Sequence, residues 1–412
     1  MRYLSEAREI VRTEGLLELT LIGLNHFFPY LLLFYNATLF YITLGLTHIV
    51  GRDDSRLVFA NVARTDFSDN TKYMFLYMNK EHGEAVRPIW LTENPELQTD
   101  LQNRGYEAYN ATSLSGRLQL LRAGHVFFDG TMREYKWAYT AGATRYQLRH
   151  GIPLKSPPKR DVGLFESALW RRTQQYDYVV TNSERDLEHC RKYTESVNYG
   201  VECNKAGIDS GEPVETGFPR NDVILREIKG ERIGVPEEME QTFDAVTEYD
   251  FVVGFFPTFR LQGSISPFES GEFEEYLQSE NIAILIRPHR QVTVDYPESK
   301  HIYELPAYGD VYPFLDRLDV LVTDYSSIGF DFSVTGKPVL FYTFDREQYE
   351  EERGVHEDYD RITVGNRVTN QAELLERLRS IQRDSEPESS VLTEFFTHRD
   401  GRSAERLAEV VL

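Results

Sequence analysis

The sequence predicts an α/β protein made of two doubly wound lobes, each a parallel sheet covered by helices. The first observation is a regular alternation of apolar, β-prone runs with helical segments after Gly51, which is typical of such sheets. The second is that the alternation stops in the Glu-rich stretch 223–249 and then restarts. The third is size, because 412 residues with 41% hydrophobic content can bury more than one core. We expect the lobes to cover residues 55–225 and 226–412.

In the first lobe, residues 68–82, "SDNTKYMFLYMNKEH", are expected to form a helix with Ser68 or Asp69 near its N-cap. Apolar runs on either side predict strands. These runs are "RLVFANV", "RPIWLT", "AGHVFFDG" and "YDYVVTNS", at residues 56–62, 87–92, 123–130 and 176–183.

In the second lobe, strands are predicted in "FVVGFFPTF" (251–259), "NIAILIRPH" (281–289), "DVLVTDY" (319–325) and "PVLFYTF" (338–344), with helical segments between them. The polar turn after the third of these strands leads into a short helix that Asp324, Ser326 or Ser327 can cap. Free backbone N–H groups at a helix start can hold a phosphate. A plain N-cap is the alternative interpretation.

The N-terminal segment, residues 1–54, differs from the rest of the chain. From Leu19 to Gly51 it contains no Asp, Glu, Lys or Arg, and its apolar part is long enough to cross a bilayer once. Pro29 would break a single long helix, and the many Tyr and Phe side chains suit a membrane interface. We expect a helical, membrane-associating segment that spans the bilayer or lies on it. The alternative is an extra helical layer packed on the first lobe.

The composition excludes several classes of function. A net charge of −21, from 66 acidic and 45 basic residues, repels nucleic-acid backbones. The same acidity is found in halophile-like proteins as well as in ordinary acidic ones. Cys190 and Cys203 are the only cysteines, too few for a disulfide framework or a zinc site, so we expect a reducing, cytoplasmic setting. Walker A, GxGxxG and metal-binding motifs are absent, and we predict neither a cofactor nor a metal.

Polar side chains follow the predicted strands, where open α/β sheets bind their ligands. Cations, hydroxyls and histidines together suit a diphosphate ester, which needs donors for its oxygens and a nearby proton acceptor. Each feature alone also has a structural explanation, such as a strand-ending turn or a core histidine. The candidates are His150, Gly151 and Lys155 in "RHGIPLK"; Arg220, Asn221 and Asp222 in "GFPRND"; Pro257, Thr258 and Arg260 in "FFPTFR"; Arg287 and His289 in "IRPHR"; and Thr323, Asp324, Ser326 and Ser327.

These motifs, taken in order, resemble those of the CDP-glycerol glycerophosphotransferases, the teichoic acid polymerase family. The stretch "FLDRLDVLVTDYSSIGFDFSVTGKPVLFYTFDREQYEEERG" resembles the C-terminal block of that family, and "RHGIPLK" resembles its W-H-G-T-P-L-K motif. "GFPRND", "FFPTFR" and "IRPHR" are similar to its G-x-P-R-N-D, P-T-W-R and R-x-H motifs, and "FANVARTDFSDNTKYMFLYM" is similar to its opening segment. The resemblance covers about residues 55–385.

The resemblance implies a GT-B-like pair of Rossmann lobes that moves glycerol phosphate, or a related polyol phosphate, from a CDP-activated donor to a hydroxyl. The implied acceptor is a membrane-linked glycan or polymer at the cytoplasmic face of the cell membrane, and CMP is released. His150 would be the base that takes the acceptor's proton, and His289 would lie against the donor phosphates. The other donor-binding candidates are Arg287, Thr323, Asp324, Ser326, Ser327, Pro257, Thr258 and Arg260; those of the acceptor side or cleft are Gly151, Lys155, Arg220, Asn221 and Asp222.

The chain departs from the family pattern at Ile152, where Thr is usual, and at Arg149, where an aromatic residue is usual. An arginine beside the base either lowers the pKa of the base or binds an anionic acceptor, so the acceptor and the polyol stay open. Two other interpretations stay open. One is a GT-B glycosyltransferase that uses a nucleotide sugar, and the other is a non-catalytic partner in the assembly of envelope glycopolymers.

Overall fold

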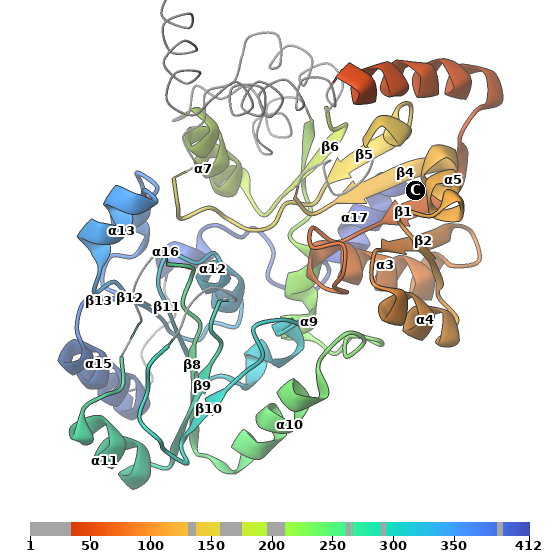
Figure 1. The fold of residues 1–412 in the computed structure, drawn as a ribbon. Helices are drawn as coiled ribbons and strands as arrows, with labels where there is room; N and C mark the ends of the chain where they lie inside the picture. The colour runs from red at the N-terminus through yellow and green to blue at the C-terminus, as the bar shows by residue number, and fades with distance from the viewer. Residues whose placement is uncertain are drawn as a thin grey trace, which may run out of the picture.

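The structure, a computed structural model, describes residues 34–130, 137–156, 175–195, 211–260, 265, 267–289, 294–384 and 390–412. Two parallel sheets form the centres of two lobes (Figure 1). Their strand orders are β3-β2-β1-β4-β5-β6-β7 and β10-β9-β8-β11-β12-β13. The predicted fold class, two parallel-sheet α/β lobes, is confirmed.

The strands of the first sheet are β1 (Asp53–Phe59), β2 (Arg87–Thr92), β3 (Glu107–Asn110), β4 (Ala123–Phe128), β5 (Thr144–Gln147), β6 (Tyr178–Thr181) and β7 (Glu212–Glu215). Those of the second are β8 (Phe251–Phe255), β9 (Ile282–Ile286), β10 (Ile302–Glu304), β11 (Val320–Thr323), β12 (Val339–Tyr342) and β13 (Arg367–Val368).

The described α-helices of the first lobe and linker are α3 (Asp69–His82), α4 (Pro95–Asn103), α5 (Leu114–Arg122), α7 (Glu184–Glu195), α9 (Asp222–Leu225) and α10 (Glu237–Ala245). Those that follow are α11 (Gly271–Ser279), α12 (Ile328–Ser333), α13 (Arg346–Glu352), α14 (Tyr359–Ile362), α15 (Gln371–Asp384), α16 (Ser390–Thr393) and α17 (Ser403–Val411). Short 3₁₀ turns include η3 (Pro219–Asn221) and η5 (Tyr312–Arg317).

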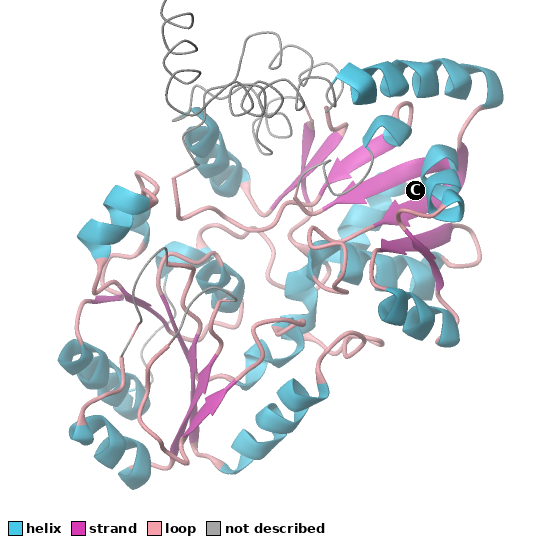
Figure 2. Ribbon diagram, viewed as in Figure 1, coloured by secondary structure: helices cyan, strands magenta, loops and turns pink. Residues whose placement is uncertain are grey.

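The central strands of the second sheet are almost wholly apolar because helices cover both faces of the sheet (Figure 2). All five residues of β9, "IAILI", are buried. Strand β9 pairs in parallel with β8, with Val253 opposite Ile284. This burial on both faces explains why the second lobe shows continuous apolar runs rather than alternation.

Side-chain caps fix where several helices begin. Asn94 accepts hydrogen bonds from the backbone N–H groups of Glu96 and Leu97 at the start of α4, and Ser270 caps α11 in the same way. Helix α3 begins differently. Ser68 occupies its N-cap position without a side-chain hydrogen bond to the helix backbone, and the next residue, Asp69, has a positive φ of 67°.

The chain passes from one lobe to the other through α9 and α10 and returns at its C-terminus. Helix α17 packs against α3 of the first lobe. The carboxylate of Asp222 caps α17, because it accepts hydrogen bonds from the backbone N–H groups of Ser403 and Ala404, each at 2.9 Å. The boundary expected at residues 225/226 stays a prediction.

Of the apolar N-terminal segment, the structure describes a helix over residues 34–50, which lies along the first lobe (Figure 1). Its inner face buries Ala37, Phe40 and Thr43, and the Phe40 ring lies 5.7 Å from that of Trp137. Among the described residues, no helix is long and apolar enough to cross a membrane. The rest of the predicted membrane-associating segment, residues 1–33, lies outside the described residues.

Candidate active site between the lobes

A cavity of about 340 Å³ lies between the two lobes, at the carboxyl ends of their strands. Its first-lobe wall contains residues that follow β1 and β5, and its second-lobe wall contains residues that follow β8, β9 and β11. The structure therefore brings together side chains that are far apart in the sequence. The predicted site residues that line the cavity are His150 and Arg220 on the first-lobe wall, and Pro257, Thr258, Arg287, His289, Ser326 and Ser327 on the second-lobe wall.

The exposed imidazole of His150 is fixed on one side by Asp69. Nδ1 of His150 lies 2.5 Å from Oδ2 of Asp69, whose side chain is only 8% exposed. A carboxylate can only accept, so this contact places the ring proton on Nδ1 and leaves the lone pair of the neutral ring on Nε2. Because the His150 side chain is 65% exposed, the ring can meet a substrate. His150 is thus arranged as a proton acceptor on the cavity wall.

Asp69 is held in turn by Arg220. Nη1 of Arg220 donates a hydrogen bond to Oδ1 of Asp69 at 2.6 Å and another to the backbone carbonyl of His150 at 3.1 Å. Burial alone would raise the pKa of Asp69, but the positive charge of Arg220 and the contact with His150 hold it below its usual value. Asp69 is therefore a carboxylate at neutral pH.

The second-lobe wall presents cationic and hydroxyl groups. Arg287 lies on the wall, and its Nη2 donates to the backbone carbonyl of Gly309 at 2.6 Å. His289 is exposed, and its ring lies 5.6 Å from that of Phe259. The hydroxyls of Ser326 and Ser327 lie in the turn between β11 and α12, on the same wall. This set of donors suits an anionic, phosphate-containing ligand.

Four of the predicted donor and cleft residues lie behind the wall and support it. Asp324 is buried and accepts hydrogen bonds from the backbone N–H of Thr258, at 2.9 and 3.0 Å. It also pairs with Arg260 at 2.9 Å, which opposes the rise in the pKa of Asp324 that burial causes. Lys155 donates to the Thr258 hydroxyl at 2.6 Å, and the Thr323 hydroxyl donates to the carbonyl of Phe256 at 2.7 Å.

The remaining predicted cleft residues, Gly151, Asn221 and Asp222, lie where helices and loops pack against one another. Gly151 has a φ of 136°, and a Cβ atom there would lie 2.5 Å from Oγ of Ser327, so the Gly151 backbone closely approaches a side chain of the other lobe at this point. Asp222 caps α17, and Asn221 is buried beside it.

Three residues of the site were not found by sequence reasoning: Asp69, Tyr312 and Asp331. Asp69 was considered only as a helix cap, although its place in the "FSDN" motif was a signal. Conversely, Arg149 does not face the cavity. Its guanidinium is buried and binds Asp186 at 2.6 and 2.9 Å, so the structure gives no support to the interpretation that it binds an anionic acceptor.

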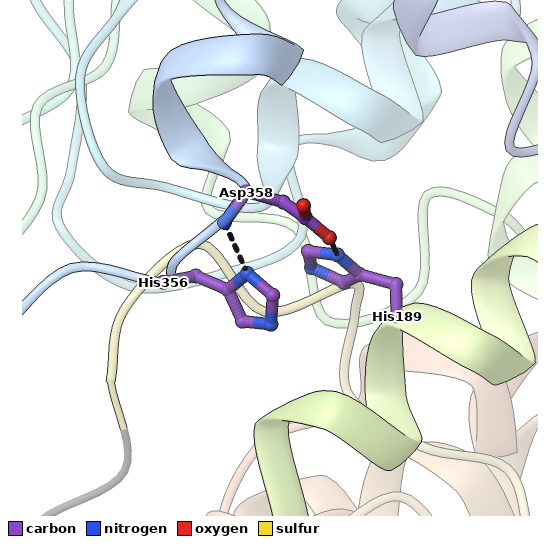
Figure 3. Close-up of side chains that lie close together, drawn as sticks. All are labelled: His189, His356 and Asp358. Carbon is purple, nitrogen blue, oxygen red and sulfur yellow. Dashed lines mark hydrogen bonds and ion pairs between the residues drawn. The ribbon is translucent and has the colours of Figure 1, made fainter. Parts of the chain in front are cut away.

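A separate group of side chains, His189, His356 and Asp358, lies where α7 meets the loop after α13 (Figure 3). Nδ1 of His356 accepts a hydrogen bond from the Asp358 backbone N–H at 3.1 Å. The Asp358 carboxylate lies near two cations, Lys192 at 3.3 Å and Arg361 at 3.5 Å. These cations compensate the charge of Asp358, and the group forms a contact between the lobes.

Comparisons with known proteins show which family the chain belongs to. A sequence model of the CDP-Glycerol:Poly(glycerophosphate) glycerophosphotransferase family matches residues 42–412. Among curated proteins, the teichoic acid ribitol-phosphate polymerase TarL of Staphylococcus aureus is 27% identical over 60% of this chain and 45% of its own length. A teichoic acid glycerol-phosphate transferase of the same organism is 25% identical over 84% of this chain and 90% of its own length.

The chain thus spans only about half the length of TarL. Among solved structures, that of the wall teichoic acid polymerase TagF superimposes with a TM-score of 0.67, at 19% identity, over 94% of this chain and 95% of the other. That likeness independently supports the two-lobed fold. Because the family model covers nearly all of the chain, the protein belongs to the CDP-Glycerol:Poly(glycerophosphate) glycerophosphotransferase family.

Proposed function

We propose that the protein transfers glycerol phosphate, or a related polyol phosphate, from a CDP-activated donor to a hydroxyl of a membrane-linked glycan or polymer. The observation that carries this proposal is the pair of cavity walls. His150, held by Asp69, lies on one wall, and Arg287, His289 and Ser326 lie on the other. A base and an anion-binding surface that share one cavity are what phosphoryl transfer to a hydroxyl requires.

In the proposed reaction, the acceptor oxygen attacks the phosphorus that carries the polyol. A new bond forms between that oxygen and phosphorus, the bond from phosphorus to the bridging oxygen breaks, and CMP leaves with the bond's electrons. His150 accepts the acceptor's proton at Nε2, and the negative charge of Asp69 stabilises the imidazolium that forms. The cavity supplies alignment as well, because the acceptor and donor are held on opposite walls.

The donor's diphosphate is proposed to lie on the second-lobe wall. Arg287 and His289 offer N–H donors to its oxygens, Ser326 and Ser327 offer hydroxyl or backbone donors, and Thr258 offers its hydroxyl. The ion pair of Asp324 and Arg260 is proposed to fix the position of Thr258 on this wall rather than to bind the nucleotide directly. On the acceptor side, Gly151 leaves room for the Ser327 side chain of the second lobe, and Asp222 caps α17 on the first lobe.

The helix over residues 34–50 is proposed to lie against the cytoplasmic face of the membrane. Its outer face is uncharged and exposes large apolar side chains, including Phe34, Tyr41, Leu46 and Ile49, the last 83% exposed. Aromatic and aliphatic side chains of this kind suit the boundary between headgroups and acyl chains. Binding to vesicles should therefore be weakened by Ile42→Ser together with Leu46→Ser, two exposed positions, and not by changes on the opposite lobe.

Donor identity can be tested by thermal shift. We expect CDP-glycerol or CDP-ribitol to raise the melting temperature, since a ligand that binds the folded state stabilises it by mass action. UDP-glucose and UDP-N-acetylglucosamine should have little effect at the same concentration. Stabilisation by a UDP-sugar alone would contradict the CDP-polyol assignment and favour a glycosyltransferase.

A further inference from the structure

Arg220 bridges two buried carboxylates that belong to different lobes. Nη1 donates to Oδ1 of Asp69, at the start of α3 in the first lobe, at 2.6 Å. Nη2 donates to Oδ2 of Asp331, in α12 of the second lobe, at 2.7 Å. The side chains of Arg220 and Asp331 are each 2% exposed. One guanidinium thus joins the residue that holds His150 to the opposite lobe.

The second-lobe end of this bridge is itself fixed. The hydroxyl of Tyr312, in η5, donates to the same Oδ2 of Asp331 at 2.8 Å. The Arg220 guanidinium also lies 5.0 Å from the centroid of the Tyr312 ring. Asp331 therefore receives two donors from different directions, and it cannot move without releasing Arg220.

The charges of the network matter as much as its geometry. Burial raises the pKa of Asp331, and the positive charge of Arg220 and the hydrogen bond from Tyr312 oppose that rise. With both carboxylates ionised, Asp69, Arg220 and Asp331 carry two negative charges and one positive charge, so the network is net negative where it meets His150. With Asp331 neutralised, Asp69 and Arg220 would cancel, and a proton arriving on His150 would meet no net compensating charge. Asp331 thus supplies, through Arg220, the negative charge that the protonated base needs.

We propose that Asp331 is a positioning residue for the base: through Arg220 and Asp69 it orients His150 and stabilises its protonated form, and it does so only while the two lobes are in contact. This inference rests on the proposed function. Helix α12 begins directly after Ser326 and Ser327, on the wall proposed to bind the donor. The wall proposed to bind the donor and the support of the base are therefore joined through this one helix.

The kinetic test compares Asp331→Asn with the wild type in release of CMP from CDP-glycerol. Asp331 does not line the cavity, so we expect kcat to fall by about ten- to a hundredfold, the order of a misaligned base, with KM for CDP-glycerol changed less than about twofold. The matched control is Asp358→Asn, which alters another carboxylate at the lobe junction (Figure 3), one that pairs with His189 and Lys192 of α7. The control should retain the wild-type kcat.

A double variant shows whether Asp331 acts on catalysis through Asp69 or by a general loss of structure. Because Asp331 acts through Asp69, adding Asp331→Asn to an Asp69→Asn protein should lower kcat by less than about twofold further. Additive losses, or a wild-type kcat in Asp331→Asn, would overturn the proposal. If Asp331→Asn does not fold, Tyr312→Phe removes one of the two donors to Asp331 and should give a smaller kcat loss that is likewise absent in the Asp69→Asn background.

A spectroscopic test does not depend on turnover. In protein labelled with ¹⁵N-histidine, the proton on Nδ1 of His150, assigned by its loss in His150→Gln, should give a protected low-field signal in the wild type and in Asp358→Asn. The signal should broaden or vanish in Asp331→Asn. An unchanged signal would overturn the inference. If the wild type releases no CMP, the proposed function fails, while this comparison still decides whether Asp331 positions the ring.

Discussion

The carboxylate of Asp69 lies 2.5 Å from Nδ1 of His150 and so fixes which nitrogen of the ring is available to a substrate. Asp69 adopts this position with a left-handed backbone, φ 67°, a conformation that Asp and Asn tolerate better than most residues. The residue that orients the base is therefore also the one at which the first turn of α3 departs from helical geometry.

The first prediction concerns Asp69→Asn. Asparagine keeps the size of the side chain and tolerates the positive φ, so the protein should fold, but the amide cannot balance the charge of a protonated His150. We expect kcat for CMP release to fall by about a hundredfold or more, measured with purified protein, CDP-glycerol and acceptor. A loss smaller than threefold would show that Asp69 has no part in catalysis.

The second prediction concerns Arg287→Ala. Removing this guanidinium from the cavity wall should weaken donor binding and raise KM for CDP-glycerol by about ten- to a hundredfold, the size of one lost charge-assisted contact. Arg317→Ala is the matched control, because Arg317 is partly exposed and pairs with Asp244. An unchanged KM for the Arg287 variant would place the donor elsewhere in the cavity.

The third prediction concerns the close approach of the lobes at Gly151. A methyl group at this position would lie 2.5 Å from Oγ of Ser327 and 3.2 Å from Nη2 of Arg220, so Gly151→Ala should push Ser327 away and strongly reduce CMP release. Gly336→Ala is the control, since Gly336 also has a positive φ, 75°, but has open space around it. Equal losses of activity in the two variants would mean that backbone strain, rather than this contact, is responsible.

The fourth prediction separates support from binding at Asp324. Because Asp324 pairs with buried Arg260 and accepts the Thr258 N–H, Asp324→Asn should lower the free energy of unfolding by about 3 kcal/mol, as expected for a broken buried ion pair. Asp100→Asn, at an exposed pair with Arg104, should cost less than about 1 kcal/mol. Urea denaturation gives both values. A variant of normal stability with a raised KM would instead indicate direct donor binding.

The fifth prediction concerns pH. Burial, with a smaller effect from the charge of His189, lowers the pKa of His356 from 6.5 to about 4. Between these values the unfolded chain binds a proton that the folded protein does not, so stability rises with pH there and is lost as pH falls from 6.5 toward 4. In His356→Gln the loss of stability at low pH should be smaller. The melting temperatures of the wild type and the variant at pH 7 and pH 5 test this prediction. An equal drop in melting temperature in both proteins would contradict it.

Much of this arrangement could be predicted from the sequence. Parallel strands buried on both faces leave continuous apolar runs such as "IAILI", and polar residues directly after such runs, including His150 and Arg287, fall at one edge of each sheet. What could not be predicted is the direction of each side chain. Asp324 and Arg287 both follow strands, yet Asp324 points into a buried ion pair and Arg287 lies on the cavity wall.

The bridge that Arg220 forms between Asp69 and Asp331 also could not be predicted from the sequence. These residues are separated by more than a hundred positions on each side, and only the packing of α3, η3 and α12 brings them together. Arg149 is the opposite case, a residue that the sequence suggests for the site and that the structure places elsewhere. It is adjacent to His150 in the sequence, but its backbone is left-handed, with a φ of 64°. Its side chain binds Asp186 in the core.

The most direct test of the proposed function is the rate of CMP release from CDP-glycerol, in the presence of a membrane lipid extract, by the wild type and by His150→Ala. We expect release by the wild type and a loss of about a hundredfold or more in the variant, the contribution of a general base. No release by the wild type, or equal rates for the two proteins, would contradict the assignment of this cavity as a site of polyol-phosphate transfer with His150 as its base.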